Sequence, residues 1–275
     1  LRRSSAASDV YKRQTEDRGD DKTSTSIARG FIENDSFSKI ENIFQSGSSW
    51  NNIHWGSRLM FKDNLLYASI GERGYGSVAQ DPTSYFGKMI RINKDGTAPM
   101  DNPYSMKEDW LPEIYQIGLR NPQGIMFYPN DSEIYITNHG PKGGDFFGKV
   151  EAGTNYGWAD VAWGGIDYDG SIIGDGSAWK EGLLKPIYTW IPSIAVSDMT
   201  FYGGDLFPEL KNKILVTSLK AQRLISLEFD GKKARNETTL FEKVGRVRDV
   251  ETNSAGEIYV IIDNEDSGIW KLVNK

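Results

Sequence analysis

The chain has 275 residues, and its 32 Lys and Arg against 38 Asp and Glu give a formal net charge of −6. This balance argues against an electrostatic nucleic-acid binder, because such proteins need a basic face. The chain has no cysteine, which excludes disulfides, thiol catalysis and thiolate zinc sites. No run approaches the ~18 apolar residues of a bilayer-spanning helix, so we expect no membrane insertion.

The N-terminal segment differs in character from the rest of the chain. Residues 1–14 read LRRSSAASDVYKRQ, without an initiating Met, an apolar segment typical of a signal peptide, or any periodicity. A further polar stretch follows at 15–26. We interpret residues 1–14 either as foreign sequence joined to the chain or as a disordered tail.

The body of the chain repeats a pair of short strands. A polar turn that runs into a β-like segment occurs at residues 62–70, 131–137, 211–217 and 255–261. A loop and a second strand-like run follow each of them, at 88–93, 148–151, 223–229 and 268–273. The last two repeats have the ~40–45-residue spacing of four-stranded propeller blades, whereas the others would carry loop insertions. With 29 glycines and no amphipathic helical stretch, the pattern predicts an all-β propeller, with a long-looped β-sandwich as the alternative.

Two histidines are the only imidazoles in the chain, and both lie in Gly-rich breaks, where loops carry function. Imidazole is the side chain best suited to move a proton near neutral pH. A lone histidine is more often a hydrogen-bonded structural residue. The family resemblance described below implies proton transfer for His54 and leaves His139 with the structural role.

Cationic and carbonyl-rich loops accompany the histidines. Arg120 lies in Gly-Leu-Arg-Asn-Pro-Gln-Gly, a turn that would present its planar donors to an anionic oxygen. The backbone carbonyls of Gly140 and Pro141 suit a hard cation such as calcium. Arg246 and Arg248 would share one face of a strand. Together these loops indicate a pocket for a polyanionic ligand.

The order of these motifs resembles that of the soluble aldose sugar dehydrogenases, the pyrroloquinoline-quinone (PQQ)-dependent relatives of soluble glucose dehydrogenase (the glucose/sorbosone dehydrogenase-like family). The resemblance runs from about Ser49 to the C-terminus, through H-x-G-x-R-L, G-[DE]-R-G, R-N-P-Q-G, H-G-P-x-G-G-D, N-Y-G-W, S-L-K and R-x-R-D-V. It implies a six-bladed β-propeller of the soluble quinoprotein glucose dehydrogenase type, with PQQ and calcium in a loop-face pocket. It also implies periplasmic or secreted oxidation of an aldose at C1 to its lactone, with the quinone performing the redox chemistry.

The resemblance implies a role for each matching position. His54 resembles the general base that takes the C1 hydroxyl proton, and Arg120 and Asn121 resemble the pair that hold the quinone oxygens, with Arg120 also stabilising developing charge. Gly140 and Pro141 match carbonyls that ligate a calcium ion, which acts as a Lewis acid. The remaining matches are Lys220, Arg246 and Arg248, which face the cofactor carboxylates, and Tyr168, Ser193 and Asp263, which are further pocket residues.

Two departures from the family pattern change these expectations. Phe146 stands where the family has a glutamate that helps to hold a second calcium with the carbonyl at Tyr156, so this second site is expected to be weak or absent. Relatives carry roughly a blade or more before His54, including a glutamine that contacts the cofactor. We therefore expect an early-blade remnant at 15–48 and a propeller domain at 49–275 with incomplete first blades and an open sheet edge.

The sequence interpretation is a truncated PQQ-dependent aldose dehydrogenase that uses a small-molecule aldose and an unidentified electron acceptor. A non-catalytic calcium- or carbohydrate-binding propeller of the same family is the main alternative. A metal-dependent lactonase or hydrolase propeller would need clustered acidic ligands on the central axis, and the sequence shows none in order. The preferred sugar, the electron acceptor, the activity of this chain by itself and the choice between monomer and homodimer stay open.

Overall fold

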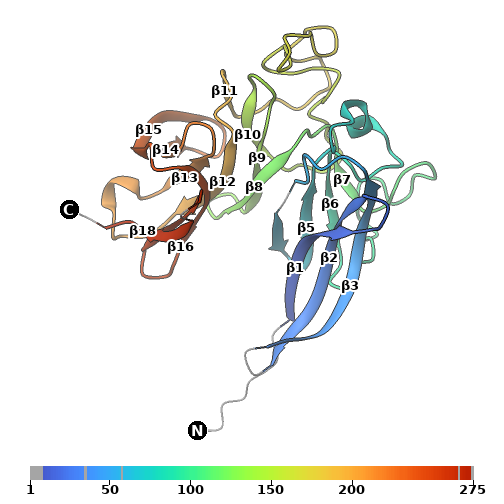
Figure 1. The fold of residues 1–275 in the computed structure, drawn as a ribbon, viewed down its shortest axis with the longest axis horizontal. Coiled ribbons are helices and arrows are strands. Elements are labelled where there is room, and N and C mark those ends of the chain that lie inside the picture. Colours follow the sequence, from blue (N-terminus) through green and yellow to red (C-terminus); the bar gives the residue numbers. More distant parts are fainter. Residues whose placement is uncertain (1–8, 34–35, 57, 266, 274–275) are drawn as a thin grey trace.

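The computed structural model describes residues 9–33, 36–56, 58–265 and 267–273. Within these residues, 18 strands form five antiparallel sheets, and the helical elements are two short 3-10 turns, Gly76–Gln80 and Pro208–Leu210. In Figure 1 the sheets follow one another in chain order as an arc, from the N-terminal sheet in blue to the C-terminal sheet in red. None of the described helices has the length and apolar character needed to cross a membrane.

Each sheet is a meander whose strands are consecutive in the chain. The first contains β1 (Asp9–Asp17), β2 (Thr23–Glu33) and β3 (Ser36–Ser49). The second contains β4 (Leu59–Lys62), β5 (Leu65–Ile70), β6 (Lys88–Ile92) and β7 (Ile114–Gln116). The third contains β8 (Pro122–Tyr128), β9 (Glu133–Asn138), β10 (Asp145–Lys149) and β11 (Tyr188–Trp190). The fourth contains β12 (Val196–Tyr202), β13 (Lys213–Ser218), β14 (Arg223–Phe229) and β15 (Ala234–Glu242). The fifth contains β16 (Arg246–Thr252), β17 (Ile258–Asp263) and β18 (Gly268–Lys271).

The β-propeller prediction is confirmed, but the prediction of six blades is wrong for the described residues, which form five. Six four-stranded blades would need about 24 strands. The 18 described strands fill three four-stranded sheets and two three-stranded ones. The alternative of a β-sandwich is also wrong, because each sheet packs against the next along the arc rather than in two facing layers.

Most of the core lies between neighbouring sheets, in four apolar clusters, and a fifth, smaller cluster packs the loop before β7 on that strand. Ile27 and Phe44 of the first sheet pack against Leu66 and Ile90 of the second. The largest cluster joins the third and fourth sheets and contains Tyr128, Tyr135, Phe147 and Phe229, with ring centroids 4.8–6.0 Å apart. Because the second and fourth sheets each pack between two neighbouring sheets, strands such as β5 and β13 are buried along most of their length instead of alternating. This packing holds the innermost strands β4, β8, β12 and β16 next to one another.

The predicted strand repeat corresponds to the two middle strands of the three four-stranded sheets, and to the middle and outer strands of the C-terminal sheet. The four polar-turn repeats are β5, β9, β13 and β17, and they pair with β6, β10, β14 and β18 respectively. The innermost strands β4, β8, β12 and β16 precede these pairs. The repeat therefore located the blades but not their innermost strands, nor the outer strands of the four-stranded sheets.

The N-terminal sheet departs from the expectation for residues 1–14. Residues 9–14 lie in β1, which pairs with β2 from Asp9 to Asp17, so a disordered tail is wrong for this part. Residues 1–8 lie outside the described residues. Cross-strand hydrogen bonds order the polar stretch at 15–26 despite its lack of apolar periodicity. The predicted boundaries of an early blade at 15–48 and a main domain at 49–275 stay predictions.

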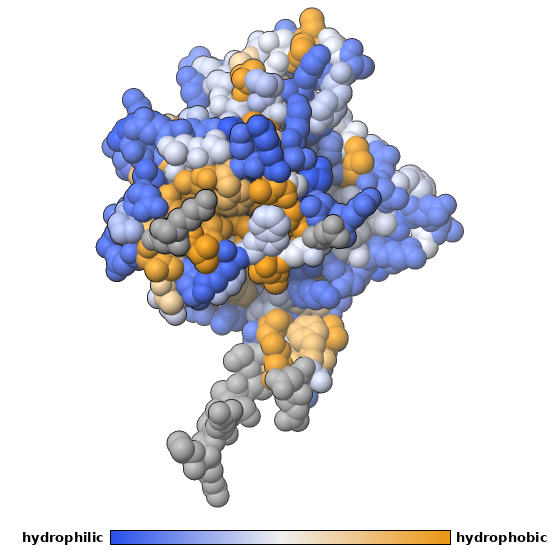
Figure 2. Space-filling view, turned by 60° about the vertical axis from the view of Figure 1, so that its left-hand side comes forward, coloured by the Kyte–Doolittle hydropathy of each residue, from blue (hydrophilic) through white to orange (hydrophobic). Residues whose placement is uncertain are grey.

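Apolar side chains are exposed on the C-terminal sheet. Ile261 of β17, Ile269 and Trp270 of β18, and Val273 are all more than one-third exposed. Figure 2, which turns this side of the molecule forward, shows apolar surface gathered there. β18 is the outermost strand of a three-stranded sheet, so one edge of its backbone has no strand partner among the described residues.

Lys88 is a charged group in the second sheet that is fully buried. Its ammonium donates to the carbonyls of Val78 and Phe86, at 2.9 and 2.8 Å, and so holds the loop that follows Gly71 against β6. Burial lowers the pKa of Lys88 from 10.5 to about 7, an effect that nearby Asp81 partly offsets.

The unfolding free energy of the protein should therefore increase between about pH 7 and pH 10 relative to a Lys88→Met variant. Below pH 7 the lysine is charged in both states and the cost of burying the charge is present in full, whereas above pH 7 only the unfolded state keeps the proton. A pKa difference of about 3.5 corresponds to at most roughly 5 kcal/mol. Urea unfolding at several pH values measures the difference in unfolding free energy between the two proteins. A difference that stays constant from pH 7 to pH 10 would contradict the prediction.

Candidate active site

His54 and Glu72 form the centre of the candidate site. The loop that precedes β4 carries His54, and the loop that follows β5 carries Glu72. The imidazole Nδ1 lies 2.7 Å from a carboxylate oxygen of Glu72, which is almost fully buried. The two loops touch through their backbones: a Cβ on Gly71 would lie 1.9 Å from the carbonyl oxygen of His54. Glycine at 71 permits this approach, and the carboxylate orients the ring with Nδ1 protonated and Nε2 free to accept a proton.

His139, the other histidine, is part of the wall rather than a second base. Its Nε2 donates to the carbonyl of Val196. Burial lowers the pKa of the His139 imidazole to about 3, so it stays neutral at physiological pH. This geometry matches the structural role that the sequence assigned to it and leaves His54 as the imidazole available for proton transfer.

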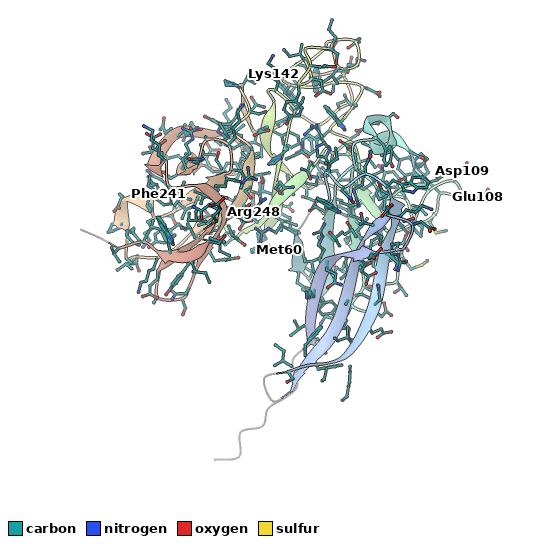
Figure 3. All side chains as sticks on the ribbon, viewed as in Figure 1. Met60, Glu108, Asp109, Lys142, Phe241 and Arg248 are labelled. Atoms are coloured by element: carbon teal, nitrogen blue, oxygen red, sulfur yellow. The ribbon has the colours of Figure 1, made fainter. Side chains whose placement is uncertain are left out.

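A cavity of about 630 Å³ opens at the centre of the arc beside His54. Its wall includes Asn121, Arg246, Arg248 and Leu219, with Arg13 and Arg58 as further cations. Figure 3 shows Arg248 at the inner side of the C-terminal sheet, facing the centre. A cavity of this size and charge suits an anionic ligand of cofactor dimensions.

Arg246 and Arg248 converge on one carboxylate, as the sequence predicted for two residues on one face of a strand. Asp263, in the paired strand β17, lies 2.6 Å from Arg248 and 3.6 Å from Arg246. The hydrogen bond from Arg248 holds the pKa of Asp263 below its ordinary value. Both arginines keep side-chain surface exposed, 50% for Arg246 and 37% for Arg248, so they retain donors for a ligand.

Arg120 and Asn121 are held by a network at the start of β8. Their backbone amides donate to the side-chain oxygen of Asn138, at 3.2 and 3.0 Å. The side-chain oxygen of Asn121 accepts from the backbone N–H of Gly56 and from the side-chain NH₂ of Gln123, which fixes the orientation of its carboxamide. The backbone N–H of Glu72 donates to the carbonyl of Arg120 at 2.9 Å, so this loop is tied to the His54–Glu72 pair.

Arg120 lies in a second cavity of about 380 Å³, which His54 also lines. The guanidinium of Arg120 lies 5.3 Å from the ring of Trp158 and 5.6 Å from that of Tyr168, and it donates to the carbonyl of Gly140 at 3.1 Å. Tyr168 is 67% exposed. His54 therefore borders two cavities: a cationic one that contains Arg246 and Arg248, and one walled by aromatic rings.

Gly140, Pro141 and Tyr156 lie around a small enclosed space next to these cavities. Its volume, about 20 Å³, is that of a single water molecule, and His139 separates it from the central cavity. The ring of Phe146 packs on that of Tyr156, with centroids 4.6 Å apart. Phe146 therefore supplies apolar packing at the position where the family pattern has a glutamate.

Three of the predicted cofactor-binding residues do not join the described wall of either large cavity. Lys220 is exposed just beyond β13, and its neighbour Leu219 lines the central cavity instead. Ser193 is buried, and its hydroxyl accepts from the backbone N–H of Asp145. Asp263 reaches the site through the two arginines rather than as a residue of the cavity wall. The ligand-binding roles of these three residues stay predictions.

Sequence reasoning missed two functional groupings that the structure brings together. Glu72 lies in the G-[DE]-R-G motif, and only the fold reveals that its carboxylate meets His54. Asp198, Asp249 and Glu251 place carboxylate oxygens within 4.8 Å of one another, although the sequence showed no ordered acidic cluster. Arg58 pairs with Asp198 and Asp249 at 3.4 and 3.2 Å and so offsets their charge at the floor of the central cavity.

Comparisons with known proteins agree with this architecture. The family model described as glucose/sorbosone dehydrogenase matches residues 4–271. Aldose sugar dehydrogenase YliI from Escherichia coli (strain K12) is 34% identical over 222 residues, which are 80% of this chain and 60% of that protein. The chain thus spans less than two-thirds of the length of this relative.

Solved structures of the same kind superimpose closely on the chain. A crystal structure of glucose dehydrogenase has a TM-score of 0.93 and 30% identity, and covers 98% of this chain and 80% of its own. The PQQ-bound form of aldose sugar dehydrogenase from Streptomyces coelicolor has a TM-score of 0.73 and 21% identity, covers 92% of this chain and 75% of its own, and supports the fold alone. The family match over nearly all of the described residues, on a propeller with this fold, means that the chain belongs to the glucose/sorbosone dehydrogenase family.

Proposed function

We propose that the protein oxidises an aldose at C1 to its lactone, with PQQ as the hydride acceptor and His54 as the general base. The observation that carries the proposal is the position of His54, bonded to a buried carboxylate and bordering both a cationic cavity and an aromatic one. Family membership supports a sugar oxidoreductase. The choice of C1, of PQQ and of the base is the proposal.

The residues of the central cavity fit PQQ, a planar quinone with several carboxylates. Arg246 and Arg248 keep exposed donors on one side of the cavity, and Asn121 has a fixed carboxamide beside His54. Guanidinium groups bind carboxylates through two parallel hydrogen bonds. When bound, the quinone supplies a two-electron acceptor for the hydride from C1.

His54 would remove the proton from the sugar C1 hydroxyl. Glu72 bonds Nδ1, so the neutral ring presents Nε2 as the proton acceptor, and the carboxylate then stabilises the imidazolium. Arg120 lies beside the base, held between two aromatic rings, where its charge would stabilise negative charge that develops in the transition state. Transfer of the proton and hydride away from the C1–OH group leaves the lactone carbonyl.

The aromatic cavity would take the sugar ring. Trp158 and Tyr168 offer ring faces on which the C–H face of a sugar packs, and Asp167 offers oxygens that accept from hydroxyl groups. His54 borders both cavities, so a sugar in one lies next to a cofactor in the other. We also propose a periplasmic or extracellular site of action and an electron acceptor that reoxidises the reduced cofactor.

Calcium would bind with the cofactor through the carbonyls of Gly140 and Pro141, next to His139, which lines both their pocket and the central cavity. The Gly140 carbonyl, which accepts from Arg120, would turn to the ion when the cofactor binds. Uncharged carbonyls bind calcium weakly by themselves, so we expect the apoprotein to take up no calcium tightly and the PQQ complex to take up one equivalent. Phe146 offers no oxygen, and its ring packs on Tyr156, which leaves no acidic ligand for a second ion at this position. Calorimetric titration with calcium measures how many equivalents bind to the apoprotein and to the PQQ complex. Equal PQQ binding in excess chelator, or two equivalents of calcium, would contradict this model.

Reconstitution tests the proposed function directly. The chain is incubated with PQQ and calcium, and aldose-dependent reduction of a dye is followed, with lactone identified as the product. Reduction that needs aldose, PQQ and calcium supports the proposal. Binding of PQQ or sugar without turnover in both this chain and a version completed to the length of its relatives would favour the non-catalytic carbohydrate-binding alternative.

A further inference from the structure

Arg73 is the residue next to Glu72, and the proposed mechanism gives it no role. It is completely buried, and its backbone adopts a left-handed conformation, with φ at +61°, that glycine favours over arginine. No ion pair among the described residues includes it. A buried guanidinium without a carboxylate partner is unfavourable, and burial lowers the pKa of Arg73. The hydrogen bonds that the guanidinium donates, rather than an ion pair, therefore hold Arg73 in place.

The donors of Arg73 hold the backbone around His54. Its Nε donates to the carbonyl of Ile53 at 3.0 Å, and Nη2 donates to the carbonyl of Asn51. The guanidinium also lies over the ring of Trp55, 5.1 Å from its centroid. The contacts thus fall on residues 51, 53 and 55, on both sides of the histidine. A further bond from Nη2 to the hydroxyl of Thr23, at 2.6 Å, anchors the arginine to β2.

His54 needs such support, because its own backbone is also left-handed, with φ at +50°. Between the end of β3 and the start of β4, the described residues 50–56 and 58 carry no regular strand hydrogen bonds. Glu72 fixes the ring, but a single side-chain hydrogen bond does not fix the position of the Cα atom from which the ring projects. Neighbouring residues 72 and 73 therefore have complementary roles, since one holds the imidazole and the other holds the backbone that carries it.

We propose that Arg73 is a positioning residue for proton transfer, which clamps the 51–55 segment so that the ring of His54 stays on Glu72 and between the two cavities. The catalytic part of this inference rests on the proposed function, whereas the effect on the ring does not. Displacement of a catalytic group by about 1 Å can cost 10²-fold in rate. Loss of the clamp should therefore lower kcat by ~10- to 100-fold, with a much smaller change in the affinity for PQQ, because the arginines proposed to hold its carboxylates, Arg246 and Arg248, lie on the C-terminal sheet and stay in place.

The test compares Arg73→Met with Arg91→Met. Arg91 is a matched control: it is also buried, lies 4.9 Å from the centroid of an aromatic ring, that of Tyr115, and bonds Asn102 and Asp101, away from the 51–55 loop. Both variants lose a buried guanidinium and should have a lowered Tm. Only Arg73→Met should change the histidine.

The first readout is the ¹⁵N–¹H NMR spectrum of the imidazoles in the protein without cofactor. The chain has two histidines, so His139 serves as an internal reference for His54. In Arg73→Met we expect the ring signals of His54 to shift and broaden while those of His139 stay, and in Arg91→Met we expect neither to move. The second readout, on the protein loaded with PQQ and calcium, is a fall in kcat at unchanged PQQ affinity in Arg73→Met alone.

Unchanged His54 signals in a folded Arg73→Met protein would overturn the inference, as would the same shifts and the same loss of kcat in Arg91→Met. If Arg73→Met does not fold, Arg73→Lys replaces it; this variant keeps the charge but loses the planar set of donors, and should give the same pattern at smaller size. Failure of the proposed function is distinguishable, because wild type would then show no aldose oxidation although the NMR spectra still report the clamp.

Discussion

Replacing His54 with alanine should lower aldose turnover by ~10²–10⁴ while PQQ binding stays close to that of the unchanged protein. The imidazole is the one that remains available as a base, since burial lowers the pKa of His139 to about 3 and its Nε2 bonds the carbonyl of Val196. Alanine leaves the cations of the central cavity in place, so the anionic cofactor keeps its partners. Steady-state kinetics of dye reduction and an absorbance titration with PQQ give the two quantities.

Glu72→Gln and exogenous imidazole are the controls for this result. Glutamine keeps an oxygen or an amide near Nδ1 but removes the negative charge that stabilises imidazolium, so turnover should fall less than in His54→Ala. Imidazole added to His54→Ala should restore part of the turnover, since the variant opens space between the two cavities. Turnover of His54→Ala equal to that of wild type would remove the assignment of the base, whatever the cofactor affinity.

The sequence located the blades because their middle strands carry a local signal. A polar turn followed by a buried apolar run is visible at β5, β9, β13 and β17 without any knowledge of distant contacts. The N-terminal sheet lacks that signal. Its strand β1 is mostly exposed and polar, and the register with β2 holds it. Propensity cannot predict such a strand, because its stability comes from pairing with a neighbour.

The site was predictable to the extent that its residues lie in short motifs. His54, Arg120 and Arg248 could be selected from sequence by the glycines, prolines and cations around them. Contacts between motifs could not: nothing in Gly-Glu-Arg-Gly states that Glu72 meets His54 or that Arg73 bonds Asn51 and Ile53. Lys220 illustrates the converse, since a motif match does not fix whether a side chain at the end of a strand turns inward.

The number of blades illustrates a different limit. The prediction of six blades came from the resemblance to a six-bladed family. The described residues instead form 18 strands in five sheets. Blade count depends on how many strands the chain supplies, and the long loops between β6 and β7 or between β10 and β11 add residues without adding strands. Motif order is insensitive to this, because the motifs lie in strands and loops of the sheets that are present.

Replacing Arg246 with alanine should have the reverse effect of His54→Ala: weaker PQQ binding by roughly tenfold, and turnover close to wild type once the cofactor is saturating. A charge-assisted hydrogen bond contributes about 1.5–3 kcal/mol, and half-exposure of this side chain puts Arg246 at the low end. The affinity should also become less sensitive to salt, since one cation fewer faces the anion.

Two further variants are controls for the effect of Arg246→Ala on PQQ binding. Arg246→Lys, which keeps the charge, should lose less affinity. Asp263→Asn removes the carboxylate that both arginines share and should strengthen PQQ binding. Titrations at two salt concentrations decide the matter: unchanged affinity in Arg246→Ala, or tighter binding than in wild type, would mean that the cofactor carboxylates lie elsewhere than beside β16.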